Sequence, residues 1–440
     1  MSVLLIILLL NSANSFQPVR QEAEYYHQHR EIILSPLADI MMTSVIQDAI
    51  NKCPAGGTVR FTPGVYHSGT ILLKDHLSLY LEKGAILMGS MNYADYTNDA
   101  FLYGNNLKDI SISGEGIIDG SDCYNPNGEE GFRGPHCIKL LSCSDLNLTG
   151  ITIRNAANWA INCRKCNNGN VTNVTILGGH DGLHTRFCGN FNIKGCNFRT
   201  GDDSFAGNDN HDFTVSDCQI NTSCNGFRLG CLNLIVERCR LWGPGEYIHK
   251  SQKRNNMLSA FVHFSPKDEN PVLENGNWLI RDVTVENVDN FFIYNFRNGL
   301  WQTGRPFTEV IFEKIDASGL LRAFYIDCDK NRDFKMTISG SSFEFRPGST
   351  VIPDTFEGVR LGTRCFVYAT NFNKISMENV TFSDMAGSQL MILENGSSVS
   401  LTDAAFNTAD EDPPFRIDGV KSVSLHTLYL NGLKLRQENE

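Results

Sequence analysis

The sequence predicts an all-β fold, a single-stranded parallel β-helix (β-solenoid) with a short capping α-helix near its N-terminus. Three observations lead to this prediction. Short alternating apolar stretches recur about every 22 residues, cysteines recur at the same period, and so do aspartates. A fixed period of this length, with several short strands in each repeat, is typical of a solenoid whose turns stack on one another.

The repeat is clearest in the middle of the chain. Its apolar residues Ile153, Ile176, Phe198, Ile220 and Leu241 follow one another at steps of 23, 22, 22 and 21 residues. A leucine-rich repeat has a similar period, but its Leu-x-x-Leu-x-Leu pattern is absent. The stretches that carry these residues are NLTGITIRNA, NVTNVTILGG, NFNIKGCNFRTG, DFTVSDCQINTS and NLIVERCRLWGP.

The cysteines follow the same period. One series occupies successive turns, with an asparagine in one place: Cys143, Cys166, Cys188, Asn210 and Cys231. A second series has steps of 22 and 21 residues: Cys196, Cys218 and Cys239. Fourteen cysteines in a secreted chain ordinarily indicate disulfides. The periodic placement favours stacked, buried thiols instead, and the spacing of Cys163 and Cys166 provides neither the second pair nor the histidine partner of a zinc site.

Both ends of the chain fit a solenoid. Residues 42–52 have apolar side chains at helical spacing, with Thr43 and Ser44 near the start. A helix there would cover the open edge of the first turn. Residues 121–136 and 243–275 are polar, rich in Gly or Pro, and outside the period. Insertions in solenoids gather on one face, often the binding face.

The N-terminus predicts export. Residues 3–10 form an unbroken apolar run that is too short to span a bilayer, and Ala13 and Ser15 provide small residues for cleavage. We predict a signal peptide at residues 1–15, a single β-helix domain at residues 16–440, and a secreted or periplasmic location. No other segment predicts a membrane span, and we expect a monomer.

The composition and overall charge indicate a globular protein that does not bind nucleic acid by default. Of 440 residues, 41% are hydrophobic and 20% are charged, which is a globular composition. The formal net charge of −11 argues against nucleic acid as a partner. No phosphate-cradling Gly-rich loop lies between a strand and a helix, so we expect no cofactor.

Three aspartates stand out within the repeat. Asp181 lies in HDG, and Asp202 and Asp203 follow 21 and 22 residues later in TGDDS. Because a step of 21 is one turn, we expect Asp181 and Asp202 to stack directly, with Asp203 beside them. Adjacent residues of a straight strand point to opposite faces, so the backbone must bend for both to face outward, and Gly201 permits this.

Three neighbouring carboxylates have three possible uses. Crowding raises the pKa of one member, which suits the acid and base roles of glycosidic bond cleavage. Clustered carboxylates also bind calcium, and a single Asp in a turn often only caps backbone groups. Because all three are predicted to face outward on adjacent turns, the functional interpretation is favoured for the set.

The sequence resembles glycoside hydrolase family 28, the polygalacturonases and their relatives. The resemblance is carried by GTVRFTPGVYHSGTILLKDHLSLYLEKGAILMGS, by ISGEGIIDG and by the HDG and TGDDS segments, from about residue 35 to 245. It implies a right-handed parallel β-helix and hydrolysis with inversion of configuration. It also implies that Asp202 is the general acid, and that Asp181 and Asp203 activate the water.

The departures from the family pattern bear on the substrate. The Asn-Thr before the first Asp is Gly179-His180 here, and the second Asp of that motif is His184. Asn225 occupies the histidine position of the Gly-His-Gly turn, with Arg228 nearby. The Arg-Ile-Lys motif that grips an acidic sugar has no clear counterpart. We therefore predict a glycosidase other than a plain polygalacturonase, exo-acting if the two insertions close one end of the groove.

Several residues are candidates for substrate binding. They are His180, His184, Asn225, Arg228, His249 and Lys250, and the last two belong to GEYIHKSQKR. Arg228 has an equally good structural interpretation as the ion-pair partner of Asp203. Trp159 and Trp242 could stack on sugar rings, but packing is the favoured interpretation for aromatic residues in these turns. The expected partner is a polysaccharide or oligosaccharide, and no metal ligand is predicted.

Two other functions remain open from the sequence. A non-catalytic, glycan-binding or adhesive β-helix is consistent with the missing histidine and Arg-Ile-Lys, although retention of all three aspartates speaks against it. A polysaccharide lyase or epimerase would use the carboxylates to hold calcium and Lys250 or Arg254 as the base. Calcium dependence would separate that class from a hydrolase.

Overall fold

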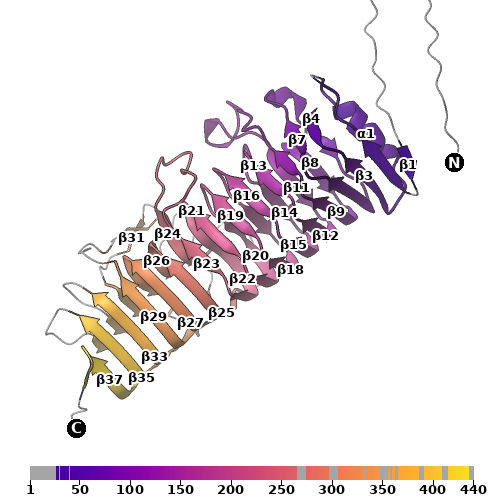
Figure 1. Ribbon diagram of the computed structural model, residues 1–440. Coiled ribbons are helices and arrows are strands. Elements are labelled where there is room, and N and C mark those ends of the chain that lie inside the picture. Colours follow the sequence, from indigo (N-terminus) through magenta and orange to yellow (C-terminus); the bar gives the residue numbers. More distant parts are fainter. Residues whose placement is uncertain are drawn as a thin grey trace, which may run out of the picture.

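A computed structural model shows the chain as an elongated coil of stacked turns (Figure 1). The structure describes residues 26–28, 30–38, 40–264, 274–296, 306–330, 333–346, 352, 355–356, 359–361, 365–385, 391–408 and 415–435. The predicted signal peptide at residues 1–15 lies outside the described residues. None of the helices in the described ranges has the length and hydropathy needed to cross a membrane.

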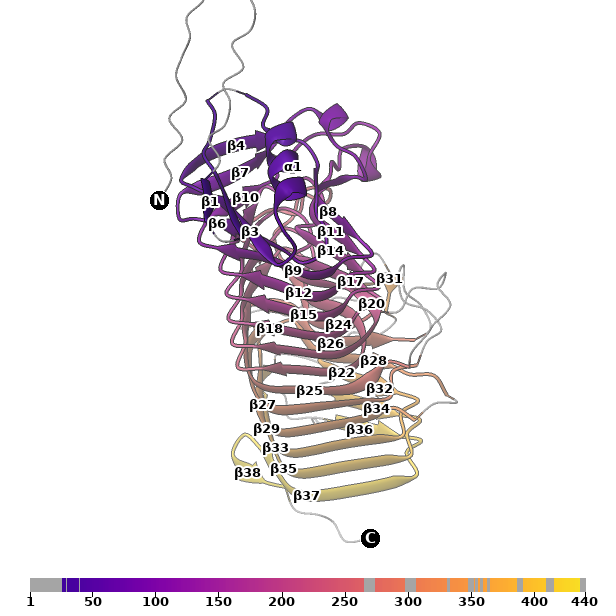
Figure 2. The ribbon, with the colours of Figure 1, turned by 90° about the vertical axis from the view of Figure 1, so that its right-hand side faces the viewer.

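Three parallel sheets run the length of the coil, and each strand pairs with the strand one turn later (Figures 1 and 2). The first sheet begins with β2 (Glu31–Leu34), β3 (Gly57–Phe61), β6 (Leu77–Leu81), β9 (Lys108–Gly114), β12 (Ser144–Thr149), β15 (Asn167–Thr172) and β18 (Gly189–Lys194). The second begins with β4 (Gly64–Ser68), β7 (Ala85–Gly89), β10 (Ile117–Asp119), β13 (Thr152–Arg154), β16 (Thr175–Gly178), β19 (Asn197–Thr200), β21 (Gln219–Thr222) and β23 (Arg240–Trp242).

The third sheet contains β5 (Ile71–Leu72), β8 (Ala100–Asn105), β11 (His136–Leu141), β14 (Ile161–Arg164), β17 (Leu183–Arg186), β24 (Met257–His263), β26 (Val288–Asn295), β28 (Arg322–Asp327), β32 (Val367–Thr370), β34 (Met391–Glu394) and β36 (Phe415–Asp418). Two long strands run from the third sheet into the first, β20 (Phe205–Ser216) and β22 (Asn225–Glu237).

Six later strands continue from the first sheet into the second: β25 (Gly276–Glu286), β27 (Glu309–Leu320), β29 (Lys335–Phe345), β33 (Lys374–Met385), β35 (Ser398–Thr408) and β37 (Ser422–Leu430). The remaining strands are β1 (Tyr26–Gln28), the hairpin of β30 (Thr355–Phe356) and β31 (Val359–Arg360), and β38 (Leu433–Lys434). The parallel β-helix predicted from the repeat is therefore confirmed.

The predicted register is confirmed at every step of its clearest series. The ladders pair Ile153 with Ile176, Ile176 with Phe198, Phe198 with Ile220, and Ile220 with Leu241. Each side chain is buried. Because strand side chains alternate between faces, one inward residue per turn at a constant step builds a continuous core.

The turns between strands explain the Asn and Asp residues that break each repeat. Asn168, Asn190, Asp212 and Asn233 all have φ between 56° and 60°, and they occupy equivalent places in successive turns. Asn and Asp tolerate this left-handed backbone better than other non-glycine residues do, because their short polar side chains bond locally. The polar punctuation of the sequence is therefore turn chemistry.

The inner face of the third sheet is an aromatic stack that leads away from the aspartates. The ring centroids of Phe205 and Phe227 are 4.5 Å apart, with the ring planes 2° from parallel, and those of Phe227 and Phe261 are 5.1 Å apart. All fourteen cysteines are buried thiols outside any disulfide, as the periodic spacing favoured. Asn210 fills the vacant cysteine place and accepts a hydrogen bond from the backbone N–H of Cys188 at 3.1 Å.

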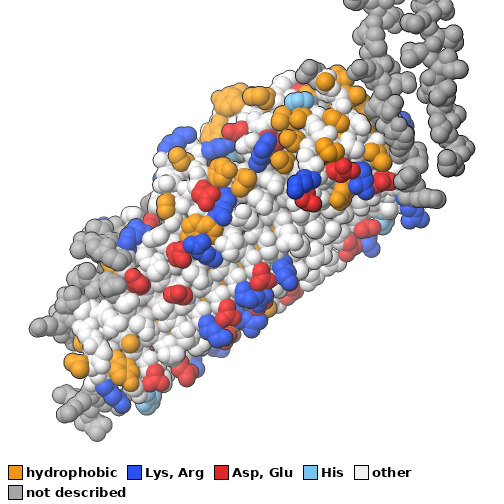
Figure 3. All heavy atoms as spheres, viewed as in Figure 1, with side chains coloured by type: hydrophobic (Ala, Val, Ile, Leu, Met, Phe, Trp, Pro, Cys, Tyr) orange, Lys and Arg blue, Asp and Glu red, His pale blue; other side chains and the backbone are white. Residues whose placement is uncertain are grey.

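The ends and insertions complete the fold. Helix α1 (Thr43–Lys52) buries Ile46, Ala49 and Ile50 against the first turns, which confirms the predicted cap. The first insertion contains the 3₁₀ turn η2 (Glu129–Gly131); η1 (Tyr93–Asp95) precedes it in the chain. The second insertion is shorter than the predicted range 243–275, because Met257–His263 forms β24 and rejoins the third sheet. Figure 3 shows acidic and basic side chains interspersed along the coil.

Candidate active site

The three aspartates lie where the chain passes from the second sheet into the third. Asp181 is in the turn between β16 and β17, and Asp202 and Asp203 are in the next turn, between β19 and β20. The ladder pairs Leu183 with Phe205, a step of 22. Asp181 is therefore aligned with Asp203, and the expectation that it stacks on Asp202 is wrong. Because the strands on both sides of the turn pair at a step of 22, Asp202 is aligned with His180.

Glycine is required in that bend, for a more specific reason than backbone freedom. A Cβ atom on Gly201 would lie 2.6 Å from the Cα of Gly179 in the turn below. The two turns approach so closely that a side chain at residue 201 would push them apart. The predicted bend at Gly201 is confirmed, and its effect is to bring Asp202 close to Asp181.

The three carboxyl groups form one cluster. One oxygen from each of Asp181, Asp202 and Asp203 lies within 4.8 Å of the other two. Asp181 and Asp203 are buried, and the Asp202 side chain is 16% exposed. They line a cleft of about 610 Å³ together with Glu129, Glu130, Arg133, Trp159, His184, Arg186, Asn208, Cys224, Arg228, His249, Gln252, Arg254 and Phe264.

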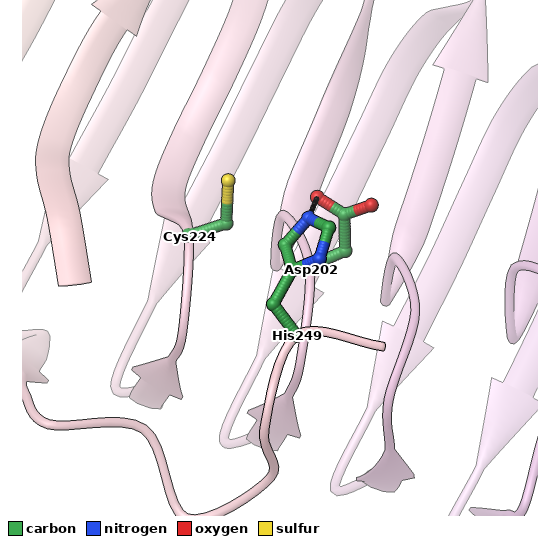
Figure 4. A group of neighbouring side chains, drawn as sticks. All are labelled: Asp202, Cys224 and His249. Atoms are coloured by element: carbon green, nitrogen blue, oxygen red, sulfur yellow. Dashed lines mark ion pairs between the residues drawn. The ribbon is translucent and has the colours of Figure 1, made fainter. Parts of the chain in front are cut away.

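Asp202 is surrounded by hydrogen-bond donors. Arg133 donates from Nη2 to Oδ2 at 3.2 Å, and the backbone N–H of Asp203 donates to Oδ1 at 3.1 Å. Nε2 of His249 lies 3.5 Å from Oδ1 (Figure 4). Burial opposes ionisation, but the hydrogen bond from His249 and then the charge of Arg133 outweigh it. Together they hold the pKa of Asp202 well below its usual range.

Asp181 has the opposite environment. It is buried, and its Oδ2 lies 2.8 Å from Nδ1 of His184. Burial, and then the charge of Asp202, raise the pKa of Asp181 well above its ordinary value. The His184 ring is stacked on Trp159, with centroids 3.5 Å apart and planes 4° from parallel. Burial, followed by the charges of Arg186 and Arg228, lowers the pKa of His184 to about 3, so this imidazole is neutral.

Asp203 is held from inside the coil. Its Oδ1 accepts from Nδ2 of Asn225 at 2.8 Å and from the backbone N–H of Asn225 at 3.2 Å. Ser259 in turn donates to Oδ1 of Asn225 at 2.6 Å. On the cleft side, Nη1 of Arg228 lies 3.5 Å from Oδ2 of Asp203, and Cζ of Arg228 lies 3.8 Å from the centroid of the Phe264 ring. The structure thus contains the ion pair that the sequence left open for Arg228.

The predicted substrate-binding residues divide into two groups. His184, Arg228 and His249 line the cleft. The other three are not among its lining residues: His180 is 3% exposed and stacked on Phe132, Asn225 is fully buried, and the partly exposed Lys250 contacts Asp122 with its stem near Gly179. Their roles in binding stay predictions.

Several cleft residues were missed by sequence reasoning. Arg133 and Glu130 belong to the first insertion, and Cys224 precedes β22. Arg254 of the second insertion, considered from the sequence only as the base of a lyase, also lines the cleft. Insertions have no period, so their residues have no predictable register. The only available signal was that insertions gather on the binding face. Trp159, for which packing was favoured, does pack against His184 but also lines the cleft.

Asp202, Cys224 and His249 are close enough together to suggest a metal site, because one ligand atom from each lies within 4.8 Å of the others (Figure 4). The hydrogen bonding of His249 argues against it. Nδ1 accepts the backbone N–H of Gln252 at 3.1 Å, so Nε2 carries the proton that points at Asp202. A ring nitrogen that carries a proton offers no lone pair to a metal.

The middle of the chain matches a known family model. Residues 73–222 match the model described as glycosyl hydrolases family 28. This range contains Asp181, Asp202 and Asp203. The exo-poly-alpha-D-galacturonosidase of Dickeya chrysanthemi is 35% identical over 100 residues, which are 18% of this chain and 17% of that protein. The chain thus spans about a sixth of the length of this relative.

Solved structures show the same fold over a greater length. The exopolygalacturonase of Thermotoga maritima superposes with a TM-score of 0.62 at 16% identity, covering 82% of this chain and 94% of that chain. The family 28 exopolygalacturonase of Yersinia enterocolitica gives 0.55 at 14% identity, covering 89% and 78%. At such identities the likeness establishes the parallel β-helix alone.

Proposed function

We propose that this chain, a distant and polygalacturonase-like homologue of glycosyl hydrolases family 28, hydrolyses glycosidic bonds of a pectin-like polysaccharide. The observation that carries the proposal is the cluster of Asp181, Asp202 and Asp203 in one cleft. Glycosidic hydrolysis needs a group that gives a proton to the leaving oxygen and another that activates water. Two neighbouring carboxyl groups whose pKa values are pushed in opposite directions satisfy that need.

We further propose that hydrolysis inverts the anomeric configuration, as the family resemblance implies. The oxygens of the three carboxyl groups lie within 4.8 Å of one another, closer than the ~6.5–9.5 Å between carboxyl groups that is usual for inverting enzymes. Carboxyl groups this close are usual for retaining enzymes, so the proposal of inversion rests on the family resemblance, and the anomer of the first product decides it.

We also propose exo action, cleavage from the end of the substrate chain, and contacts between the two insertions support it. Ser251 donates to Oε2 of Glu130 at 2.5 Å, and Lys250 contacts Asp122. Glu130 also binds Arg133 at 2.8 Å at the wall of the cleft. A wall tied together at several points closes one side of the groove, which favours an exo mode of action. The Dickeya and Thermotoga proteins also carry exo-acting names.

The sugar is proposed to differ from that of a plain polygalacturonase. Recognition of a uronate needs a cationic side chain that faces the substrate. Arg133 is bound to Glu130 and Asp202, and Arg254 donates to the backbone carbonyl oxygens of Ser223 and Asn256. Arg228 is paired with Asp203, so at least three of the four arginines that line the cleft are bound to protein partners, which supports a less acidic unit of a pectin-like polymer. Action outside the cytoplasm, as the predicted signal at residues 1–15 suggests, is part of the same proposal.

Release of reducing sugar from plant and algal polysaccharides and oligosaccharides tests the proposal. Wild type is compared with Asp202→Asn and with Asp217→Asn, a matched control whose aspartate pairs with Arg238 on the surface. We expect release from at least one glycan that Asp202→Asn abolishes, that Asp217→Asn retains, and that a chelator leaves unchanged. Binding without release, in wild type and variant alike, would instead establish a glycan-binding β-helix.

A further inference from the structure

A second cavity lies toward the C-terminal end of the coil, away from the aspartates. It has a volume of about 500 Å³, and the side chains that decide its chemistry are those of Lys330, Asp333, Asn371, Asn373, Asn395 and Lys421. All of them belong to the turns that lead from the third sheet into the first. We call this cavity the turn pocket.

The register of the sheets builds the turn pocket from stacked turns. Thr370 pairs with Glu394 and Glu394 with Asp418, so residues 371–373, 395–397 and 419–421 form equivalent turns, one above another. The preceding turn, between β28 and β29, is longer and spans residues 328–334. A long turn beside short ones leaves a step in the surface, and the long turn contributes Lys330 and Asp333 to it.

The absence of a side chain at Gly396 is a requirement of this stack. A Cβ atom there would lie 2.1 Å from Cε2 of Phe372 in the turn below, and Phe372 is only 3% exposed. The Phe372 ring therefore occupies the space beside Gly396 and gives the pocket an apolar part of its wall. The polar groups of the pocket lie around this ring.

Asn371 is the polar side chain that points to a ligand. It is 8% exposed and lines the pocket, yet among the described residues its carboxamide has no hydrogen-bond partner. The other two asparagines differ, because Asn373 donates to Asp333 at 3.0 Å and Asn395 donates to Oγ1 of Thr370 at 3.4 Å. A buried carboxamide without a partner is costly, so a group that enters the pocket and bonds to Asn371 gains from it.

The charge of the turn pocket is the opposite of that of the whole chain. Lys330 and Lys421 are exposed, and within the described ranges neither ammonium group has an ion-pair partner. Asp333 is the one carboxylate in the lining, and it accepts the hydrogen bond from Asn373. The lining thus carries one net positive charge on a chain with a formal net charge of −11. In the cleft, by contrast, Arg133 and Arg228 are paired with aspartates.

The turn pocket is separate from the cleft. Five successive strand pairings lead from β20, which follows the aspartates, to β32, which precedes Asn371 (Figure 2). At about 4.8 Å for each pairing, the two sites lie roughly 24 Å apart along the coil. A polysaccharide chain is long enough to reach both.

We propose that the turn pocket is a second glycan-binding site, which binds a uronate-bearing segment of a polysaccharide. Lys330 and Lys421 bind the carboxylate, and the carboxamide of Asn371, which donates and accepts, bonds to sugar hydroxyls. The site goes beyond the proposed hydrolysis and depends on it only for the choice of glycan. A polymer held here raises the local concentration of its less acidic units at the cleft.

Affinity electrophoresis in native gels that contain polygalacturonate tests the proposal. Every protein carries Asp202→Asn, so that the glycan stays intact during the run. Lys330→Gln/Lys421→Gln is compared with Lys83→Gln/Lys314→Gln, a control of equal charge whose lysines pair with Glu115 and Asp282 on the surface. Mobility in a gel without glycan is the reference for each protein, and a gel with neutral galactan is the matched control for the polymer.

We expect polygalacturonate to retard the parent protein and the control pair alike. The apparent Kd of Lys330→Gln/Lys421→Gln should be higher by roughly 2- to 30-fold, the range for two exposed ion pairs. Asn371→Asp, which keeps the shape and adds a repelling carboxylate, should weaken retardation as well. Neutral galactan should retard none of these proteins more than another.

Two results would overturn the inference. One is equal retardation of the pocket variant and the control pair, and the other is release by phosphate as effective as release by oligogalacturonate at equal ionic strength, which indicates general anion attraction. Because the assay needs no turnover, it separates this inference from the proposed function. Retardation that depends on Lys330 and Lys421, in a protein whose wild type cleaves no glycan, would contradict the hydrolase and retain the second site.

Discussion

Gly201→Ala tests whether the close approach of two turns builds the catalytic cluster. The new Cβ would lie 2.6 Å from Cα, 2.7 Å from O and 2.8 Å from C of Gly179. Ordinary contact begins at 3.4 Å, so the two turns must separate by about 0.8 Å. All three neighbouring atoms are backbone, and no flexible side chain can move aside. Asp202 follows Gly201 directly, and Asp181 follows Gly179 by two residues, so the separation acts on the catalytic geometry.

The expected cost has two parts. Overpacking of this kind destabilises by about 1–3 kcal/mol. A displacement approaching 1 Å at a catalytic group lowers the rate by up to about 10²-fold. We therefore expect kcat of Gly201→Ala to fall by about 10- to 100-fold, measured by reducing-sugar release, with a modest loss of stability in urea.

Gly178→Ala is a matched control one turn below. A Cβ there would meet the backbone N of Asn155 at 3.6 Å and that of Ala156 at 3.7 Å, which is ordinary contact. It should therefore retain wild-type activity and stability. Equal activities in Gly201→Ala and Gly178→Ala would refute the view that contact between the turns sets the geometry of the cluster.

Three further predictions follow from the site and the core. Asn225→Ala removes a hydrogen bond to the Asp203 carboxyl group and leaves the Ser259 hydroxyl without its acceptor. Chemical denaturation should therefore show that the free energy of unfolding falls by about 2–4 kcal/mol. A variant as stable as wild type would contradict this. Because the pKa of His184 is lowered to about 3, its ring resonances, assigned with His184→Gln, should not titrate between pH 8 and pH 4.5; a midpoint near the ordinary value of about 6.5 would disprove the buried neutral imidazole. The buried thiols should react with a thiol reagent only after denaturation. All fourteen should then react without prior reduction, and fewer reactive thiols would reveal disulfides.

The coil could be predicted well from the sequence because the same packing requirement repeats in every turn. One inward side chain per turn must land on the one below it, so residues such as Ile176 and Phe198 reveal the register without any structure. The cysteine series carried the same information. The helix over residues 43–52 was recognisable because its apolar spacing changes from the strand pattern to the helical one.

The catalytic cluster was predictable in composition but not in geometry. Asp181, Asp202 and Asp203 were identified from a spacing near one turn, yet the local step is 22 and not 21, so Asp203 rather than Asp202 aligns with Asp181. The step varies between 21 and 23 along the chain, so counting alone cannot reveal which of two adjacent aspartates is aligned with Asp181.

The walls of the cleft were beyond sequence reasoning. Glu130 and Arg133 lie in an insertion whose path depends on contacts such as Ser251 with Glu130, 121 residues apart in the chain. His249 was identified only as a candidate within a polar segment, and its tautomer depends on a single backbone N–H, that of Gln252. Interactions of this kind have no periodic signature.

The stereochemistry and source of oxygen in the first product test hydrolysis at the aspartate cluster most directly. Wild type, Asp202→Asn and Asp217→Asn would be followed by NMR in water enriched in ¹⁸O, with the glycan that wild type degrades. The account predicts one ¹⁸O atom at the anomeric carbon of the product and the inverted anomer at early times, for wild type and Asp217→Asn only. A product without ¹⁸O that contains a new double bond, or equal turnover by Asp202→Asn, would contradict it.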